Sequence, residues 1–247
     1  MTIGSLEGNE TGFVSLGANN LRIGSNNLTT SFAGVITGAG GSLTKIGSGT
    51  LILSGANTYT GNTNINRGVL QVDGSITSNT FVNGGGTLAG TGTINGNVTN
   101  NGKVSPGSAG VPGMLTVVHN YTQAQYATLM IQIAGASAGQ FSVLDVLGTA
   151  NLNGLLNPDL LNGFVPTVGE TFTFLNYGAM NGTLSIFNPN IDNLPEHWEV
   201  TYFPTYALLT VASGNVAIPD QGSTFLLLML GLLSLVTFRR QLGRKQS

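Results

Sequence analysis

The sequence predicts an all-β protein in which short parallel strands wind into stacked coils, a β-solenoid. Glycine accounts for 37 of 247 residues, and charged residues make up 7% of the chain, where an ordinary globular domain has about 25%. Hydrophobic residues still make up 41%, so the chain has the apolar material for a core and does not have the composition of a disordered protein. Short apolar segments also recur at nearly constant intervals, which is typical of a repeat architecture.

Two strand motifs share one repeat period in the first half of the chain. The motif at 49–55, Gly-Thr-Leu-Ile-Leu-Ser-Gly, recurs at 68–74 and more loosely at 86–92, at offsets of 19 and 18 residues. Between these copies, the motif at 62–66 recurs at 79–83, at an offset of 17. Apolar residues alternate within these strands, so one face of each strand points to a shared core. Since one coil cannot bury that face alone, we expect neighbouring coils to stabilise each other.

The chain divides into three segments. We assign residues 1–111 to the repeat region and residues 112–213 to continued coils with a terminal cap, because an open coil end is an exposed strand edge. Residues 214–247 form a separate tail. The second segment contains longer predicted strands, at 128–133, 141–146, 171–175 and 207–211.

The tail contains an uncharged apolar run that ends at a pair of arginines. Counted from residue 223 to 238, the run has 16 residues and would measure about 24 Å as a helix, against a hydrocarbon core of about 30 Å. A single C-terminal hydrophobic helix in the membrane explains this pattern better than a helix buried in a protein core. The basic residues Arg239 and Arg240 place the C-terminus in the cytoplasm and the rest of the chain outside.

Residues 43–74 closely resemble the autotransporter-associated β-strand repeat. The matching text begins Leu-Thr-Lys-Ile-Gly-Ser-Gly-Thr-Leu-Ile-Leu-Ser-Gly and continues through Ala-Asn-Thr-Tyr-Thr-Gly. The resemblance implies a right-handed parallel β-helix like the passenger region of autotransporters and related surface proteins. It is dense in the first half of the chain and looser from 112 to 211.

The tail resembles the PEP-CTERM sorting signals that exosortases process, in the variant form Val-Pro-Asp-Ser-Gly. Pro219, Asp220 and Gly222 match that form and Ser223 follows them, whereas Ile218 and Gln221 replace the Val and the Ser. The resemblance implies an exosortase-type processing enzyme as partner. It also implies that residues 223–238, with Arg239 and Arg240, hold the chain in the inner membrane before processing. The ectodomain would then be surface-exposed on the cell envelope or secreted.

The first residues carry no recognisable export signal. Residues 1–7 contain neither a charged segment nor an apolar one, as a secretory signal peptide requires. We expect the sequence to be a fragment that begins inside the repeat array, with a wrongly assigned start codon as the alternative.

Composition argues against several classes of function. Residues 1–217 carry nine acidic and four basic residues, a net charge of −5, so nucleic acid is not expected as a partner. Cysteine is absent, which removes disulfides, thiolate metal sites and a cysteine nucleophile. The histidines, His119 and His197, are far apart without metal-ligand spacing. We therefore expect no cofactor and no metal site.

The acidic residues are mostly isolated, and only one local cluster combines titratable groups with an aromatic residue. Glu196 and Glu199 flank His197 and Trp198. Glycoside hydrolysis needs two carboxylates across one bond, but a solvated loop with a cap aromatic explains this cluster better. Neither Arg nor Lys occurs from 104 to 238, which argues against a lyase for acidic polysaccharides. We therefore predict no catalytic residues.

The sequence thus favours a structural or adhesive surface protein sorted or anchored through its tail. The alternative is a carbohydrate-binding or carbohydrate-active β-helix, with surface polysaccharide as the partner and Trp198 as the candidate glycan contact. Aromatic residues in alternating strands are more often core residues. A fully buried Trp198 would therefore count against this alternative.

Overall fold

A computed structural model describes residues 1–191 and 194–214, and all regular structure in these ranges is β-strand. Backbone contacts divide the chain into two units, Met1–Ser213 and Gly214–Ser247. The predicted tail elements, namely Pro219, Asp220, Gly222, Ser223, the apolar run 223–238 and the pair Arg239 and Arg240, lie outside the described residues. In the part of the chain that the structure describes, no helix has the length and apolar character needed to cross a membrane.

The first part of the described chain contains strands β1 to β13. Their bounds are β1 (Thr2–Ile3), β2 (Phe13–Ser15), β3 (Asn20–Ile23), β4 (Thr30–Phe32), β5 (Val35–Thr37), β6 (Ser42–Lys45), β7 (Thr50–Leu53), β8 (Ala56–Asn57), β9 (Thr63–Val72), β10 (Ser75–Ile76), β11 (Thr80–Gly90), β12 (Thr93–Ile94) and β13 (Val98–Asn100).

Strands β14 to β24 follow and are on average longer. They are β14 (Lys103–Ser108), β15 (Val111–Pro112), β16 (Met114–Val117), β17 (Tyr121–Gln123), β18 (Thr128–Ile133), β19 (Val143–Leu152), β20 (Leu155–Leu160), β21 (Thr171–Gly182), β22 (Ser185–Ile186), β23 (His197–Tyr202) and β24 (Tyr206–Ala212).

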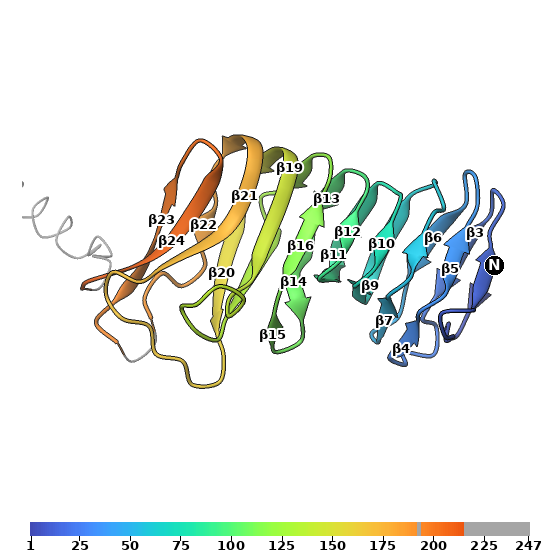
Figure 1. Ribbon diagram of the computed structural model, residues 1–247, viewed down its shortest axis with the longest axis horizontal. Coiled ribbons are helices and arrows are strands. Elements are labelled where there is room, and N and C mark those ends of the chain that lie inside the picture. The colour runs from blue at the N-terminus through green and yellow to red at the C-terminus, as the bar shows by residue number, and fades with distance from the viewer. Residues whose placement is uncertain (192–193, 215–247) are drawn as a thin grey trace, which may run out of the picture. The chain divides into compact units, whose positions relative to one another are not determined.

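Strands β1 to β14 each pair in parallel with a strand one coil away, and β15 pairs antiparallel with β14. Strand β9 pairs with β6 and β7 on one side and with β11 on the other, and β11 continues to β13 and β14. Figure 1 shows these strands side by side from the blue N-terminal end to the yellow-green β19. The result is one large, mainly parallel sheet, which is consistent with the predicted β-solenoid.

The core is built from columns of apolar residues that occupy the same position in successive coils. In one column each member pairs in register with the next, across six strands. All of its side chains are at most 1% exposed. The column consists of Leu51, Leu70, Leu88, Val104, Leu129 and Leu156. The predicted alternation of apolar residues and the offset of 19 between the motifs at 49–55 and 68–74 are thereby confirmed.

One predicted strand begins later than expected. The apolar pattern predicts a strand over 141–146, but β19 begins at Val143, and Phe141 makes only an isolated antiparallel bridge to Ile133. The side chain of Ser142 turns inward, and its hydroxyl donates a hydrogen bond of 2.7 Å to the Pro106 carbonyl. The Ser142 amide also donates a hydrogen bond of 2.8 Å to the Gln132 carbonyl, so residues 141–142 pair back on the end of β18 and are not part of β19.

The direction of pairing changes in the last described strands. β21 pairs in parallel with β19, but it pairs antiparallel with β24, which pairs antiparallel with β23. In Figure 1 these orange strands form the end of the stack opposite the N-terminus. The two antiparallel strands cover the edge that β21 would otherwise expose.

Candidate functional site

Trp198 lies on β23 and belongs to an aromatic cluster under the antiparallel strands. Its side chain is buried, at 4% exposure, and its ring packs edge-on against Phe172 with 5.9 Å between centroids. Phe172 also makes edge-on contacts with Phe141 at 5.4 Å and Phe164 at 6.4 Å. This burial favours the core role for Trp198. The prediction that it contacts a glycan remains untested.

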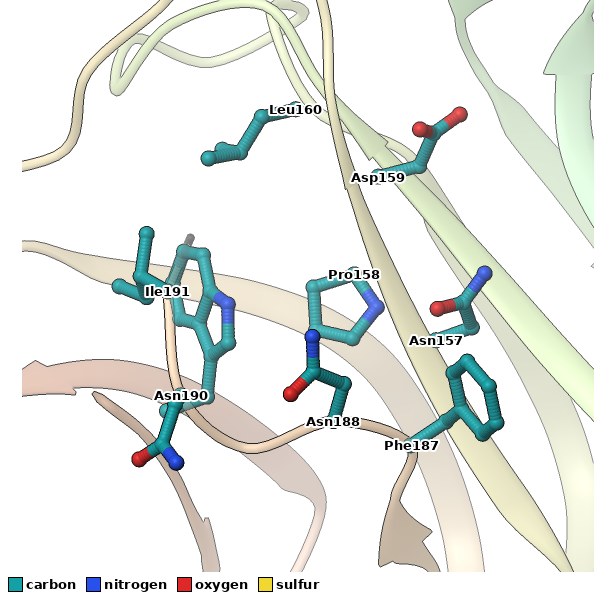
Figure 2. Close-up of a pocket in the computed structure, with 9 residues that line it drawn as sticks. Asn157, Pro158, Asp159, Leu160, Phe187, Asn188, Asn190 and Ile191 are labelled. Carbon is teal, nitrogen blue, oxygen red and sulfur yellow. The ribbon is translucent and has the colours of Figure 1, made fainter. Parts of the chain in front are cut away.

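A pocket of about 340 Å³ lies between β20 and the segment that follows β22, and Trp198 is one of the residues that line it. Figure 2 shows Pro158 and Asn157 on one side of it and Asn188 and Phe187 on the other. Among the described residues that line it, Asp159 is the one carboxylate. A single carboxylate does not supply the acid and nucleophile, or acid and base, of glycoside hydrolysis.

Strand β23 separates the residues of the predicted titratable cluster. Because side chains alternate along a strand, Trp198 faces the core, whereas Glu199 is exposed. His197 Nε2 lies 3.1 Å from Glu199 Oε1. Glu196 precedes the strand, and its carbonyl accepts a hydrogen bond from the Ile191 amide. Within the described ranges, no group of three His, Cys, Asp or Glu residues is arranged to hold a metal ion.

Buried polar side chains of the repeat form a second class of site, which the sequence reasoning missed. Lys45, at the end of β6, is 1% exposed, and burial lowers the pKa of its ammonium group. Its Nζ donates hydrogen bonds to the carbonyls of Ile46 at 2.7 Å, Gly47 at 3.0 Å and Arg67 at 3.3 Å. Because Arg67 belongs to the next coil, this side chain ties two coil corners together.

Asn57 connects three coils through its amide group. Its Oδ1 accepts a hydrogen bond of 2.9 Å from the Ile36 amide, one coil earlier. Its Nδ2 donates to the carbonyl of Gly55 in its own coil, at 3.0 Å, and to that of Ser75 in the next coil, at 3.2 Å. The side chain is fully buried, so each of these groups would lose its partner without it.

Tyr59 begins a buried chain of hydroxyl groups. Its phenol lies 2.6 Å from Thr63 Oγ1, which lies 2.7 Å from Ser78 Oγ in the next coil. Burial raises the pKa of Tyr59 to about 12, so the phenol stays neutral and hydrogen-bonded at neutral pH.

A third set of polar residues lies on the outer surface of the coils. Asn79, Asn97 and Asn120 occupy the same corner in three successive coils. Asn79 Oδ1 accepts a hydrogen bond of 2.9 Å from the backbone amide of Asn97, and Asn97 Oδ1 accepts one of 3.1 Å from the backbone amide of Asn120. Asn120 Oδ1 continues the ladder by accepting from the Thr149 amide at 2.9 Å. Of the ladder residues, Asn79 begins a copy of the predicted strand motif at 79–83, whereas Asn97 and Asn120 lie outside the copies found in the sequence.

The Asn ladder borders a shallow hollow of about 310 Å³ on the face of β11, β13, β17 and β19. A row of outward-facing side chains forms the rest of its lining, with one residue from each strand in register. These residues are Phe81, Thr99, Thr122 and Asn151.

Comparison with known proteins gives two family matches. Residues 43–72 match the passenger-associated transport repeat, and residues 217–242 match the VPDSG-CTERM motif. Both resemblances predicted from the sequence are confirmed.

Curated relatives match over short segments. Two extracellular serine proteases of Serratia marcescens are 54% and 50% identical over 48 residues, and the adhesin BmaC autotransporter of Brucella suis biovar 1 (strain 1330) is 48% identical over 66 residues. These segments cover 19%, 19% and 26% of this chain. They amount to 5% of each protease and 2% of the adhesin.

The matched repeat contains the residues that hold the coils together. Lys45, Asn57, Tyr59 and Thr63 all lie within 43–72, and all four are buried and hydrogen-bonded. The passenger-associated transport repeat at 43–72 is therefore a structural element of this chain. Its similarity to the proteases assigns no catalytic group to this chain.

Proposed function

We propose that this chain belongs to an exported bacterial surface protein that uses its solenoid as a rigid structural or adhesive element. A passenger-type repeat and a C-terminal sorting motif occur in one chain, and this combination carries the proposal. The repeat-bearing relatives are named as extracellular proteases and an adhesin autotransporter. The stacked coils supply a stiff body whose outer surface is rich in Asn and Thr.

The finer features of the proposal concern the hand of the coil and the tail. The coil is right-handed, as the passenger resemblance implies. Residues 1–111 are the repeat region, 112–213 the continued coils with their cap, and 214–247 the sorting segment. An exosortase-type enzyme processes the motif around Pro219, Asp220, Gly222 and Ser223. Until then a helix over 223–238, flanked by Arg239 and Arg240, holds the chain in the inner membrane.

Intact-mass analysis of the native protein after cell fractionation tests export and processing together. We expect a surface or secreted product that ends near Pro219 to Gly222. Asp220→Ala should leave an uncut product in the membrane fraction, whereas Gln221→Ser, which restores the variant motif, should be processed at least as well. An uncut wild-type protein in the inner membrane would contradict sorting, and a cytoplasmic protein would contradict export.

The carbohydrate-binding alternative does not gain support from Trp198. Its ring is buried against Phe172, and a sugar ring needs an exposed aromatic face for stacking. A purified protein that degraded polysaccharide, with activity lost in Glu196→Gln or Glu199→Gln, would contradict the non-catalytic proposal.

A further inference from the structure

We propose that the hollow beside the Asn ladder binds a neutral polysaccharide chain that lies across the strands. The inference deepens the proposed function, on which it rests, because only an exported chain meets such a polymer outside the cell. It concerns a surface separate from the Trp198 pocket. The lining residues come from β11, β13, β17 and β19 and from the corner before each of the first three strands.

The first support is the chemistry of the lining. Six of its seven side chains are amides or hydroxyls, from four Asn and two Thr residues, and the seventh is Phe81. Sugar hydroxyls both donate and accept hydrogen bonds, as amide and hydroxyl groups do. The half-buried ring of Phe81 supplies an apolar surface on which the C–H face of a sugar can pack. The hollow thus presents both kinds of surface that a pyranose ring requires.

The second support is that the polar groups are already ordered. The Oδ1 atoms of Asn79, Asn97 and Asn120 each accept a backbone amide of the next coil. These bonds fix the amide planes along the corner. Asn151 Nδ2 also donates to Thr122 Oγ1 at 3.4 Å, which leaves the Thr122 hydroxyl hydrogen available to a ligand. A preorganised site loses less side-chain entropy on binding.

The third support is the repeat distance. Phe81 pairs with Thr99, Thr99 with Thr122, and Thr122 with Asn151, so the row has one side chain per strand. Adjacent strands lie about 4.8 Å apart, which is close to the length of one sugar residue in an extended polysaccharide. An extended chain perpendicular to the strands can therefore meet one side chain of this row at each successive sugar.

The fourth support is charge. None of the seven lining residues carries a charge. An anionic polymer would find no Arg or Lys to pair with its carboxylates, and a cationic polymer would find no Asp or Glu. A neutral glycan is the class of polymer that this lining complements.

Calorimetric titration of the full chain, kept in a detergent without a sugar headgroup, tests the proposal. The probes are cellohexaose, maltohexaose and laminarihexaose, with an alginate hexamer as the anionic comparison. We expect at least one neutral hexaose to bind, with an affinity unchanged between about 50 and about 500 mM salt. Phe81→Ala should weaken binding about tenfold because it removes the aromatic contact.

Two further variants separate loss of the site from loss of the fold. Thr99→Val keeps the side-chain shape and removes one hydroxyl, so it should weaken binding severalfold with unchanged circular dichroism. Phe13→Ala removes an exposed ring on β2 (68% exposed), outside the hollow, and should leave binding unchanged.

The inference is overturned if no neutral hexaose binds, if alginate binds better, or if Phe81→Ala and Thr99→Val bind as well as the wild type. A chain that reaches the cell surface but binds no hexaose would overturn this inference and leave the proposed function standing. A chain that binds a hexaose but stays in the cytoplasm would contradict the proposed export and leave the binding site standing.

Discussion

Lys45 is a charged side chain that connects two coils in a repeat with few other charged residues. Its ammonium group is buried, which disfavours the charged form, yet three carbonyls surround it. Replacing a buried charge with an apolar group can be neutral when its partners are satisfied in another way. Lys45 Nζ donates to all three carbonyls, and since the carbonyl of Arg67 belongs to a different coil, loss of the ammonium group removes a contact between coils.

We expect Lys45→Met to lower the free energy of unfolding by about 1–3 kcal/mol, because three carbonyls, all in part-buried hydrogen bonds, lose their donor. Urea unfolding followed by circular dichroism measures this change. Lys103→Met is the control, since Lys103 is half-buried without a hydrogen bond to its side chain among the described residues, and it should shift stability by at most about 0.5 kcal/mol. Equal stabilities of the two variants would show that desolvation of the ammonium cancels its hydrogen bonds.

The buried tyrosines predict a loss of stability at alkaline pH. Burial raises the pKa of Tyr59 to about 12 and also raises the pKa of Tyr121. In the unfolded chain both ionise near pH 10. Above pH 10 the unfolded state therefore binds fewer protons than the folded state, and stability falls as pH rises towards the folded pKa values.

Urea midpoints between pH 8 and pH 11.5 test this dependence. We expect a steady wild-type value up to about pH 10 and a decline above it, to which Tyr59 contributes about 2 kcal/mol by about pH 11.5. Tyr59→Phe should flatten the decline, whereas Tyr126→Phe, at an exposed turn position (86% exposed), should leave it unchanged. A decline of the same slope in Tyr59→Phe would assign it to other groups.

At the residue scale, the position of Lys45 can be read from strand alternation, but its hydrogen-bond partners cannot. Leu43 and Lys45 are two residues apart, so strand alternation places both on the inner face. A lysine on that face is unexpected from composition alone, and its burial depends on carbonyls that only the stacked corners bring together. Trp198 is buried, and its contact with Phe172 depends on the antiparallel strands, which the alternation does not predict.

At the scale of the element, the close contact between coil corners restricts which residues can occupy a corner position. Gly68 lies between the two halves of β9 with a φ of 68°. A Cβ atom there would lie 2.5 Å from the carbonyl oxygens of Gly47 and Gly49 in the preceding coil. The glycine is needed both for its backbone conformation and for the close approach of the next coil.

Two glycine variants separate these causes. Gly110 has a similar φ of 75°, but a Cβ atom there would meet nothing within 4 Å. Gly110→Ala should therefore cost only the conformational strain of about 1–2 kcal/mol. Gly68→Ala should cost more than that, because the backbone of two coils must also shift. Thermal unfolding of both variants measures the difference, and equal losses would show that the coils separate without cost.

The elements follow the sequence where the repeat is regular and depart from it where the repeat ends. The copies at 49–55 and 68–74 became β7 and the second half of β9, in the predicted register. The switch to antiparallel pairing at β21, β23 and β24 could not be read from the sequence, because alternating strands have the same pattern in parallel and antiparallel sheets. The late start of β19 likewise follows from the pairing of residues 141–142 with the end of β18, which the apolar pattern does not predict.

At the scale of the whole described unit, contacts join each coil mainly to its neighbours. In such a stack, stability is a sum of local terms, and one end can open before the other. Trp198 is the single tryptophan of the chain, so its fluorescence reports on the antiparallel end alone. Circular dichroism reports on all strands together.

We expect Phe172→Ala, which removes the ring that Trp198 packs against, to lower the stability of this end by about 3–5 kcal/mol. The fluorescence transition should then occur at lower urea than the circular dichroism transition, because the coils of the repeat region keep their own contacts. Phe13→Ala, at the opposite end, should leave the fluorescence midpoint unchanged. Coincident transitions in Phe172→Ala would show that the stack unfolds as one cooperative unit.

The pairing of each strand with the preceding coil also sets the order in which the chain can fold. The strands of the repeat region pair only with neighbouring coils. A coil can therefore form as soon as its neighbour is present, before the far end of the chain has folded. A chain that crosses a membrane unfolded can therefore fold progressively on the far side. Each completed coil would then oppose backward sliding, so folding itself would provide a driving force for the export that we propose.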